Sequence, residues 1–394
     1  MLDSIYIGMT GLISFSKGLS NISNNVANLN TPGFKGYQLE FLDLSYSYQY
    51  SGSPEQQGAP STQGSGVKTG ASIPHFSQGE FRQTGNDLDV AIDGNGFFVL
   101  RKDGEVFYTR AGQFKVDESG YLVTDDGARV AGLSGNTPVD ISIAGKRSNP
   151  GKATKTVTFV DSLSTTSSDF DVNSIMIYDS LGIPHQLTLS LINDAANVPG
   201  HWTFSLLEGS TTLTTGNVYY SGDGSPISGL DKHTFTYRAG NGSDATALTL
   251  DFSGSTYYSS SASGLRVGSQ DGYTAGFLSK TAIDANGNLV LTYSNGQTLK
   301  EESLALAWFD NLSSLQAQGS NRYTVFGDVK RILGRAGENG MGNLKTGGIE
   351  LSNVDLAQEF SELIILQRGY QASSQVITAA NEMIQQLGEI RGRR

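Results

Sequence analysis

Two stretches with apolar residues at helical spacing lie at opposite ends of this chain. Along each stretch the apolar or small positions alternate in steps of three and four, as on one narrow face of a helix. These positions are Leu2, Ile5, Met9, Leu12, Ser16, Leu19, Ser23 and Val26 at the start, and Leu363, Leu366, Tyr370, Ser373, Ile377, Ala380, Ile384 and Leu387 at the end. A stripe this narrow is typical of a coiled-coil seam. The pattern therefore predicts two long terminal helices that pair with each other.

The two stripes are also candidates for contact with other subunits. Each would run for roughly 40 Å at 1.5 Å per residue. A striped helix often just covers the core of its own chain, but here the sequence between the ends is polar, glycine-rich and strand-like. An exposed apolar surface of this length indicates association. Our candidate interface residues are Leu12, Leu19 and Val26 on the first helix, and Leu363, Leu366, Tyr370, Ile377, Ile384 and Leu387 on the last.

The first helix is expected from Leu2 to Asn28. It contains Gly8, Gly11 and Gly18, and each glycine costs roughly 1 kcal/mol relative to alanine inside a helix. We therefore expect this helix to form only where packing compensates for its low propensity. A proline then disfavours the helical conformation of the residue before it, and a glycine supports a turn. The residues expected to form this exit turn are Asn28, Pro32, Gly33 and Phe34.

Composition excludes several classes of protein. The 394 residues include 49 glycines and no cysteine, which favours many turns and short strands and excludes disulfides and thiolate chemistry. The net charge is −11, and no Lys/Arg cluster forms a stripe that could follow a phosphate backbone, so we expect no nucleic-acid partner. No apolar run is long enough to span a membrane. Asp3 and Lys17 do not fit a secretory signal, so export would have to follow a route that keeps the N-terminus.

The middle of the chain predicts a nested, mainly β architecture. Short alternating segments separated by Asp-Gly and Asn-Gly turns begin near Ser72, are interrupted by a Ser/Thr-rich β segment, and resume near Gly276. Residues 45–70 show no period and are expected to be an extended or irregular connector, and Ser352 or Asn353 could cap the last helix. The fold class is thus α+β, mainly β, with paired terminal helices and two nested β domains. The expected segments are 1–30 (helix), 31–71 (connector), 72–145 (inner β domain), 146–274 (inserted outer β domain), 275–348 (inner β domain) and 349–394 (helix).

No residue pattern predicts catalysis or a cofactor. Asp87, Asp89 and Asp93 precede a glycine but miss the spacing of a calcium loop, so turn-forming roles explain them better. The histidines are His75, His185, His201 and His233, and they lack the spacing of metal ligands. No nucleophile elbow, zinc-protease motif or phosphate-binding loop is present. We expect a protein without enzymatic activity, cofactor or metal.

Four blocks of sequence resemble a known family. They are NNVANLNTPGFKG (Asn24–Gly36), DLDVAIDGNGFFVL (Asp87–Leu100), YTRAGQFKVDESGYLVTDDG (Tyr108–Gly127) and the helix-forming stretch Ser352–Leu387. In this order they are similar to the shared blocks of axial proteins of the bacterial flagellum, the rod and hook family. Residues 146–274 show no such resemblance. A chain of this length with a large insert resembles the hook subunits of that family.

The resemblance implies a function and partners. It implies a subunit that polymerises helically into the flagellar hook, the flexible joint that transmits torque from the rod to the filament. It also implies export by the flagellar type III apparatus to the cell exterior. The implied partners are other copies of the chain, the distal rod protein, the hook cap and the hook–filament junction proteins.

Two alternatives remain open from the sequence. The stretch Pro54–Gly70 is similar to an extra segment of distal rod proteins, which makes a rod subunit the second hypothesis. The third is a β-rich surface adhesin that binds a glycan or host protein through exposed aromatic residues of the insert. The residues that would serve this purpose are Tyr219, Tyr220, Tyr257 and Tyr258.

Overall fold

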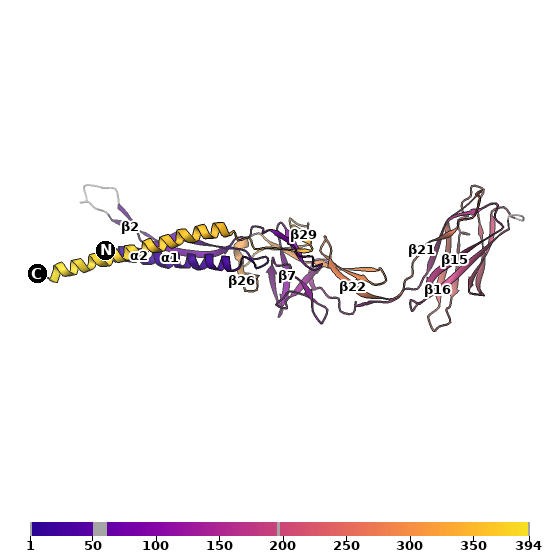
Figure 1. Cartoon of the computed structure of the whole chain (residues 1–394), viewed down its shortest axis with the longest axis horizontal. Helices are drawn as coiled ribbons and strands as arrows, with labels where there is room; N and C mark the ends of the chain where they lie inside the picture. Colours follow the sequence, from indigo (N-terminus) through magenta and orange to yellow (C-terminus); the bar gives the residue numbers. More distant parts are fainter. Residues whose placement is uncertain (1, 50–60, 195–197, 393–394) are drawn as a thin grey trace. The chain divides into compact units, whose positions relative to one another are not determined.

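The computed structural model describes residues 2–49, 61–194 and 198–392, and within them it has two long helices, at the two ends of the chain, and 30 strands between them (Figure 1). The expected class, mainly β with paired terminal helices and β-rich domains, is confirmed. The chain divides into two compact units. Unit 1 comprises Met1–Ile143, Thr281–Val290 and Lys300–Arg394, and unit 2 comprises Ala144–Lys280 and Leu291–Leu299. Among the described residues no helix is long and apolar enough to cross a membrane.

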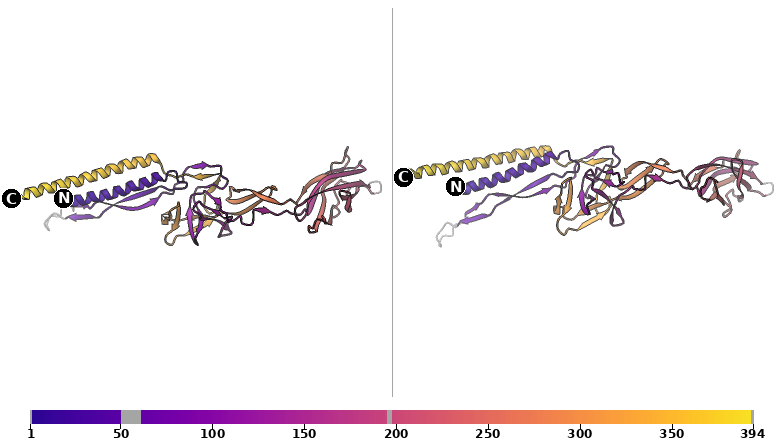
Figure 2. Two further views of the ribbon diagram at one scale, coloured as in Figure 1. Left: turned by 60° about the horizontal axis from the view of Figure 1, so that its bottom comes forward. Right: turned by 90° about the horizontal axis from the view of Figure 1, so that it is seen from below.

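The terminal helices α1 (Leu2–Ala27) and α2 (Leu356–Gly392) lie side by side and run antiparallel (Figure 2). The first helix ends one residue before the expected boundary. The last begins several residues later than expected, and its cap is Asp355, whose Oδ1 accepts the Ala357 N–H at 2.8 Å. The expected caps were wrong because Asn353 is committed elsewhere: its Oδ1 accepts the Gly36 N–H at 2.8 Å.

The described part of the connector, expected to be extended or irregular over 45–70, consists of strands of a β-ribbon; residues 50–60 lie outside the described residues. Strand β1 (Tyr37–Asp43) pairs antiparallel with β4 (Val67–Pro74), and β2 (Tyr46–Gln49) pairs with β3 (Ser61–Gly64). An isolated two-stranded ribbon is marginally stable. Here α1 supports it, because the Val67 N–H donates to Thr10 Oγ1 at 3.3 Å and Lys17 Nζ donates to Thr69 Oγ1 at 3.2 Å.

The β body of unit 1 is assembled from two separate stretches of chain. Early strands pair with late ones: β5 with β30, β6 with β29, β7 with β25, β8 with β27 and β11 with β24. Their apolar faces enclose a core that includes Phe97, Phe309 and Tyr323. The early strands are β5 (Phe81–Gln83), β6 (Val90–Asp93), β7 (Phe97–Lys102), β8 (Glu105–Thr109), β9 (Lys115–Val116), β10 (Leu122–Val123), β11 (Arg129–Ser134) and β12 (Thr137–Asp140). The late ones are β25 (Leu306–Phe309), β26 (Leu315–Ala317), β27 (Arg322–Val325), β28 (Arg331–Gly334), β29 (Asn343–Thr346) and β30 (Gly348–Glu350), with a short 3-10 helix at Leu312–Ser314.

Four more strands belong to the sheet that also contains β7, β8 and β11. They are β13 (Ser148–Asn149), β22 (Gly276–Ile283), β23 (Asn288–Tyr293) and β24 (Thr298–Leu304).

Unit 2 contains two four-stranded sheets that share one hydrophobic core. Their strand orders are β19-β20-β14-β21 and β15-β16-β17-β18. Alternate residues of both sheets, such as Phe159 and Trp202, are fully buried in that core. The strands are β14 (Thr156–Ser164), β15 (Asp169–Tyr178), β16 (Pro184–Asn193), β17 (His201–Glu208), β18 (Thr211–Tyr219), β19 (Lys232–Tyr237), β20 (Thr246–Tyr258) and β21 (Arg266–Gln270).

We expect unit 2 to lose stability in acid through Asp179, which follows β15 and has a side chain only 1% exposed. Although burial alone would raise its pKa, hydrogen bonds from Asn241 and from the backbone of Ile183 hold the pKa at about 2, below the ordinary 3.8. The folded state therefore gains about 2 kcal/mol above pH 4 and loses it as the pH falls toward 2. Denaturant unfolding from pH 7 to 2 should show this loss, and Asp179→Asn should reduce it; an equal loss in both proteins would contradict the assignment.

Candidate assembly site

Helix α1 faces α2 with glycines, and the two backbones approach closely. A Cβ atom at Gly8 would lie 2.7 Å from Ile377 Cγ1, and one at Gly18 would lie 2.6 Å from Leu366 Cδ1. Both distances are shorter than a normal carbon–carbon contact. Gly11 is placed in the same way between them. The glycines that weaken α1 as an isolated helix are therefore the residues that let it pair with α2.

The register of the α1 seam differs from the one expected from the sequence. The expected residues Leu12, Leu19 and Val26 are only half-buried, at the sides of the contact. The buried stripe lies one position earlier and consists of Gly8, Gly11, Ser14, Gly18, Ile22 and Asn25. Sequence reasoning missed these glycines because it treated them only as helix breakers, although their spacing of three and seven residues follows the same helical face.

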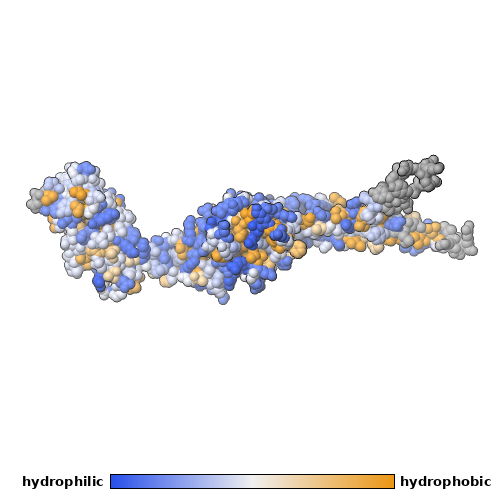
Figure 3. All heavy atoms as spheres, turned by 180° about the vertical axis from the view of Figure 1, so that it is seen from behind, coloured by the Kyte–Doolittle hydropathy of each residue, from blue (hydrophilic) through white to orange (hydrophobic). Residues whose placement is uncertain are grey.

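The candidate residues of α2 fall into two groups. Leu363, Leu366 and Ile377 are half-buried, and the last two contact α1. Tyr370, Ile384 and Leu387 remain 41%, 36% and 51% exposed. Figure 3 shows apolar residues on the surface of the helical pair. Further exposed apolar side chains on the two helices are Tyr6, Met9, Ile13, Leu356, Phe360, Ile364, Ile365, Val376 and Met383. One copy of the chain thus leaves much of this apolar surface in water.

The exit turn after α1 is bound tightly to the β body. Gly33 has φ +66°, and its N–H donates to the backbone oxygen of Glu350 at 2.8 Å. Pro32 O accepts the Asn321 side-chain amide at 2.7 Å. Phe34 is 9% exposed, and Asn28 O accepts the Thr31 N–H at 3.1 Å. All four residues expected in the turn therefore lie in it.

A buried ionic cluster, which sequence reasoning missed, lies directly behind this turn. Lys35 Nζ is 2.6 Å from Glu350 Oε1 and donates to Ser77 O at 2.7 Å. Glu350 Oε1 also accepts the Gly79 N–H at 2.8 Å, and Arg110 Nη1 lies 3.6 Å from Glu350 Oε2. Burial lowers the pKa of both Lys35 and Arg110, and the Glu350 carboxylate opposes that shift. One carboxylate therefore compensates two buried cations.

Glu350 connects the C-terminal end of α1 with the N-terminal end of α2. Its side chain contacts Lys35, which follows the exit turn of α1, and its backbone precedes α2 by only a few residues. Because buried charges require partners with good geometry, this cluster defines one arrangement of the two chain ends on the β body. We refer to Gly33, Lys35, Arg110 and Glu350 as the junction.

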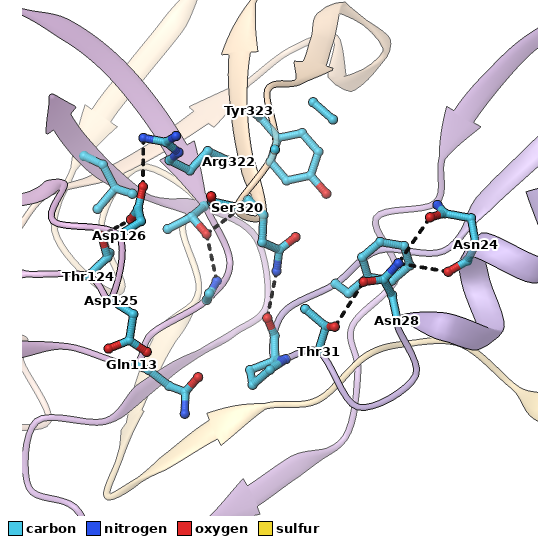
Figure 4. A pocket seen from close by; sticks show the side chains of 18 of the residues that line it. Asn24, Asn28, Thr31, Gln113, Thr124, Asp125, Asp126, Ser320, Arg322 and Tyr323 are labelled. Atoms are coloured by element: carbon cyan, nitrogen blue, oxygen red, sulfur yellow. Dashed lines mark hydrogen bonds and ion pairs between the residues drawn. The ribbon is translucent and has the colours of Figure 1, made fainter. Parts of the chain in front are cut away.

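A cavity of about 690 Å³ opens beside the exit turn (Figure 4). Asn28 and Thr31 line it from the helix end, and Asp126 and Arg322, whose charged groups are 3.0 Å apart, line it from the body. Figure 4 shows the hydrogen bonds that Asn28 donates to Asn24 and accepts from Thr31 at the helix end. Within the described residues no three acidic or histidine side chains are arranged to hold a metal ion.

Two of the aspartates that the sequence analysis compared with a calcium loop bind different neighbours. Asp89 accepts hydrogen bonds from Thr84 and Asn86, whereas Asp93 pairs with Lys345 at 2.8 Å. They therefore have different partners.

The four tyrosines proposed for adhesion are not equally exposed. Tyr220 is buried and stacks on Tyr257 with ring centroids 5.5 Å apart, and Tyr219 stacks on His201. Tyr258 is 52% exposed. The aromatic surface expected for an adhesin is thus reduced largely to one side chain.

Comparison with known proteins gives matches along the whole chain. Four family models match: "Flagella basal body rod protein" over residues 5–35, "Flagellar hook protein FlgE/F/G D1 domain" over 91–161, "Flagellar basal body protein FlaE D2 domain" over 146–273, and "Flagellar basal body rod FlgEFG protein C-terminal" over 345–390. The third covers the insert, for which the sequence had shown no resemblance.

Relatives match over nearly their full length. The flagellar hook protein FlgE of Borreliella burgdorferi is 31% identical over 98% of this chain and 99% of its own. The basal-body rod protein FlgG of Bacillus subtilis is 26% identical over 98% of both. The crystal structure of Helicobacter pylori FlgE2 aligns with a TM-score of 0.51 and 14% identity over 67% of this chain and 99% of that one, a likeness of fold alone.

Proposed function

The chain belongs to the flagellar hook protein FlgE family, and from this membership we propose that it polymerises through its terminal helices into the tube of the bacterial flagellar hook. The hook assignment takes precedence over the rod hypothesis because the hook relative is the more similar of the two. The protein is thus a structural part of the flagellum. We propose in addition that it has no enzymatic activity.

The observation that carries this mechanism is the exposed apolar surface of the helical pair. Tyr370, Ile384 and Leu387 on α2, together with Tyr6 and Ile13 on α1, are 36–53% exposed in the described part of one chain. Burying such side chains stabilises an assembly by about 1.5–3 kcal/mol each. Head-to-tail contacts between different surfaces generate helical tubes when they do not close into a ring. A second copy of the chain is therefore the partner that we assign to this surface.

Assembly also suits the weak helix propensity of α1. With Gly8, Gly11 and Gly18 on its contact face, α1 depends on packing for its stability. A chain whose ends order only on binding is compatible with passage through the flagellar type III channel. In the same proposal the distal rod protein, the hook cap and the hook–filament junction proteins contact the ends of the tube.

We expect Leu387→Asp, and likewise Ile384→Asp, to prevent polymerisation at concentrations at which the parent assembles while leaving the monomer folded, because each side chain is exposed in one copy and buried in the tube. The loss of about 3 kcal/mol per contact corresponds to a critical concentration roughly a hundredfold higher. Leu366→Asp and Ile377→Asp should also prevent assembly, but with a loss of helix content in the monomer. Electron microscopy and sedimentation of the purified chain distinguish these results.

The matched control is Leu230→Asp in unit 2, where the parent side chain is 50% exposed, close to the 51% of Leu387. This variant should polymerise like the parent. Normal tubes from Leu387→Asp and Ile384→Asp would exclude the proposed surface.

The location of the subunit within the flagellum is tested by labelling isolated hook–basal bodies with an antibody against residues 146–274. Label along the curved segment outside the envelope is expected. Label confined to the straight rod would instead support the hypothesis of a rod subunit.

A further inference from the structure

His185, at the start of β16 in unit 2, lies between two carboxylates from different elements. Its Nε2 is 3.2 Å from Asp179 Oδ2, and its Nδ1 is 3.0 Å from Glu208 Oε1. The ring is only 14% exposed and meets the edge of Tyr237 at 5.7 Å. Both ring nitrogens are thus committed to acceptors.

Only a charged ring can donate to both carboxylates at once. A neutral imidazole has one N–H, whereas an imidazolium has two and can donate to both carboxylates. Asp179 does not supply the missing proton, since it already accepts the Leu181 and Ile183 N–H groups at 2.9 Å and the Asn241 amide at 2.6 Å. These hydrogen bonds outweigh its burial and keep its pKa at about 2.

Other titratable groups surround this site. The Tyr237 hydroxyl donates to Glu208 Oε1 at 3.0 Å. Burial and the neighbouring Glu208 raise the pKa of Tyr237, so it stays protonated. Arg238 and Asp244 on the loop that carries Asn241 are exposed. Histidine is the residue whose charge ordinarily changes between pH 5 and 8.

The turn from Asp179 to Ile183 contacts both chain segments that lead into and out of the core of unit 2. A Cβ atom at Gly182 would lie 2.9 Å from Gly151 Cα and 3.0 Å from Ala275 N. The Tyr178 N–H, just before the turn, donates to Thr154 Oγ1 at 2.8 Å. A change in this turn is therefore passed directly to both segments.

We propose that His185 is a proton-dependent clasp that holds the Asp179–Ile183 turn, and through it the two connecting segments, to the core of unit 2. As an imidazolium the ring bridges Asp179 and Glu208. When one proton leaves to solvent, the bare nitrogen faces a carboxylate and that half of the bridge opens. This inference does not depend on the hook assignment.

The test is histidine-selective nitrogen-15 NMR with amide hydrogen exchange on the full monomeric chain from pH 5 to 9. At pH 5 both His185 nitrogens should carry protons. As the ring loses one, the protection factors of the Leu181 and Ile183 amides should fall about tenfold, the loss expected for one charge-assisted hydrogen bond. A His185 ring that is neutral throughout, or protection that stays constant while the ring titrates, would overturn the proposal.

Variants distinguish a proton-dependent bridge at His185 from a role of this residue in general stability. His185→Gln should remove the pH step in protection, whereas the control His75→Gln in unit 1 should keep it. If His185→Gln does not fold, Glu208→Gln serves instead, because it keeps the shape and removes one charge. The step should then move to lower pH together with the ring titration, and a step that stays in place would contradict the proposal.

Discussion

Gly33→Ala is expected to lower the stability of the junction by about 3 kcal/mol or more and to abolish polymerisation. The glycine has φ +66°, a conformation that costs an alanine about 1–2 kcal/mol. Its new Cβ would in addition lie 2.6 Å from Ala111 N and 2.7 Å from the carbonyl carbon of Arg110. Both are backbone atoms, so no side chain can rotate away to relieve the contact. Denaturant unfolding followed by electron microscopy measures both effects.

The matched control for this variant is Gly104→Ala. Gly104 has φ +83° but would place its Cβ in open space. It should lose only the conformational cost of about 1–2 kcal/mol and still polymerise. Equal losses in the two variants would show that the close approach at Ala111 contributes nothing.

Glu350→Gln is expected to cost about 3–5 kcal/mol, because it leaves two buried cations without a counter-charge. Lys35 is fully buried and Arg110 is 3% exposed, so neither can reach water without opening the junction. The bases of both helices should then become mobile together. Unfolding by denaturant gives the magnitude, and hydrogen exchange around residues 33–36 and 348–356 gives the location.

Two further variants test whether unpaired charge causes the loss of stability in Glu350→Gln. Adding Lys35→Met to Glu350→Gln should recover part of it, since one unpaired cation disappears. Asp125→Asn removes a carboxylate 2.9 Å from Lys115, but this pair is 81% and 57% exposed, so the variant should lose under about 1 kcal/mol. A double variant no more stable than Glu350→Gln alone would contradict the electrostatic explanation.

The contact between α1 and α2 shows what helical periodicity in the sequence can and cannot predict. The three-and-four spacing correctly predicted two helices and their pairing, because an amphipathic stripe needs a partner. The stripe of α1 that contacts α2 lies one residue earlier than Leu12, Leu19 and Val26, whose role in contacts with other subunits stays a prediction. Large apolar residues normally mark a seam, but here close backbone approach at Gly8, Gly11 and Gly18 places the larger side chains at its sides.

The ribbon β1–β4 and the junction escaped prediction for a different reason. Strand β1 does alternate in polarity, with Tyr37, Leu39 and Phe41 separated by polar residues, but its partner β4 lies farther along the chain and α1 supports the pair. Lys35 and Glu350 stand 315 residues apart, and nothing local marks either as buried. Residue patterns report on neighbours along the chain, whereas these features depend on neighbours in space.

The sequence by itself determined the helical ends, the β-rich middle with its insert, the exit turn at Pro32 and Gly33, and membership of the flagellar axial family. These properties depend on local periodicity, on turn chemistry and on blocks of consecutive residues. Only the tertiary structure decided the register of the seam, the ionic junction of Lys35, Arg110 and Glu350, and the bridge at His185. Each of these requires distant residues to meet at distances of about 3 Å, and the energetics of buried charge and close packing act only after the chain has folded.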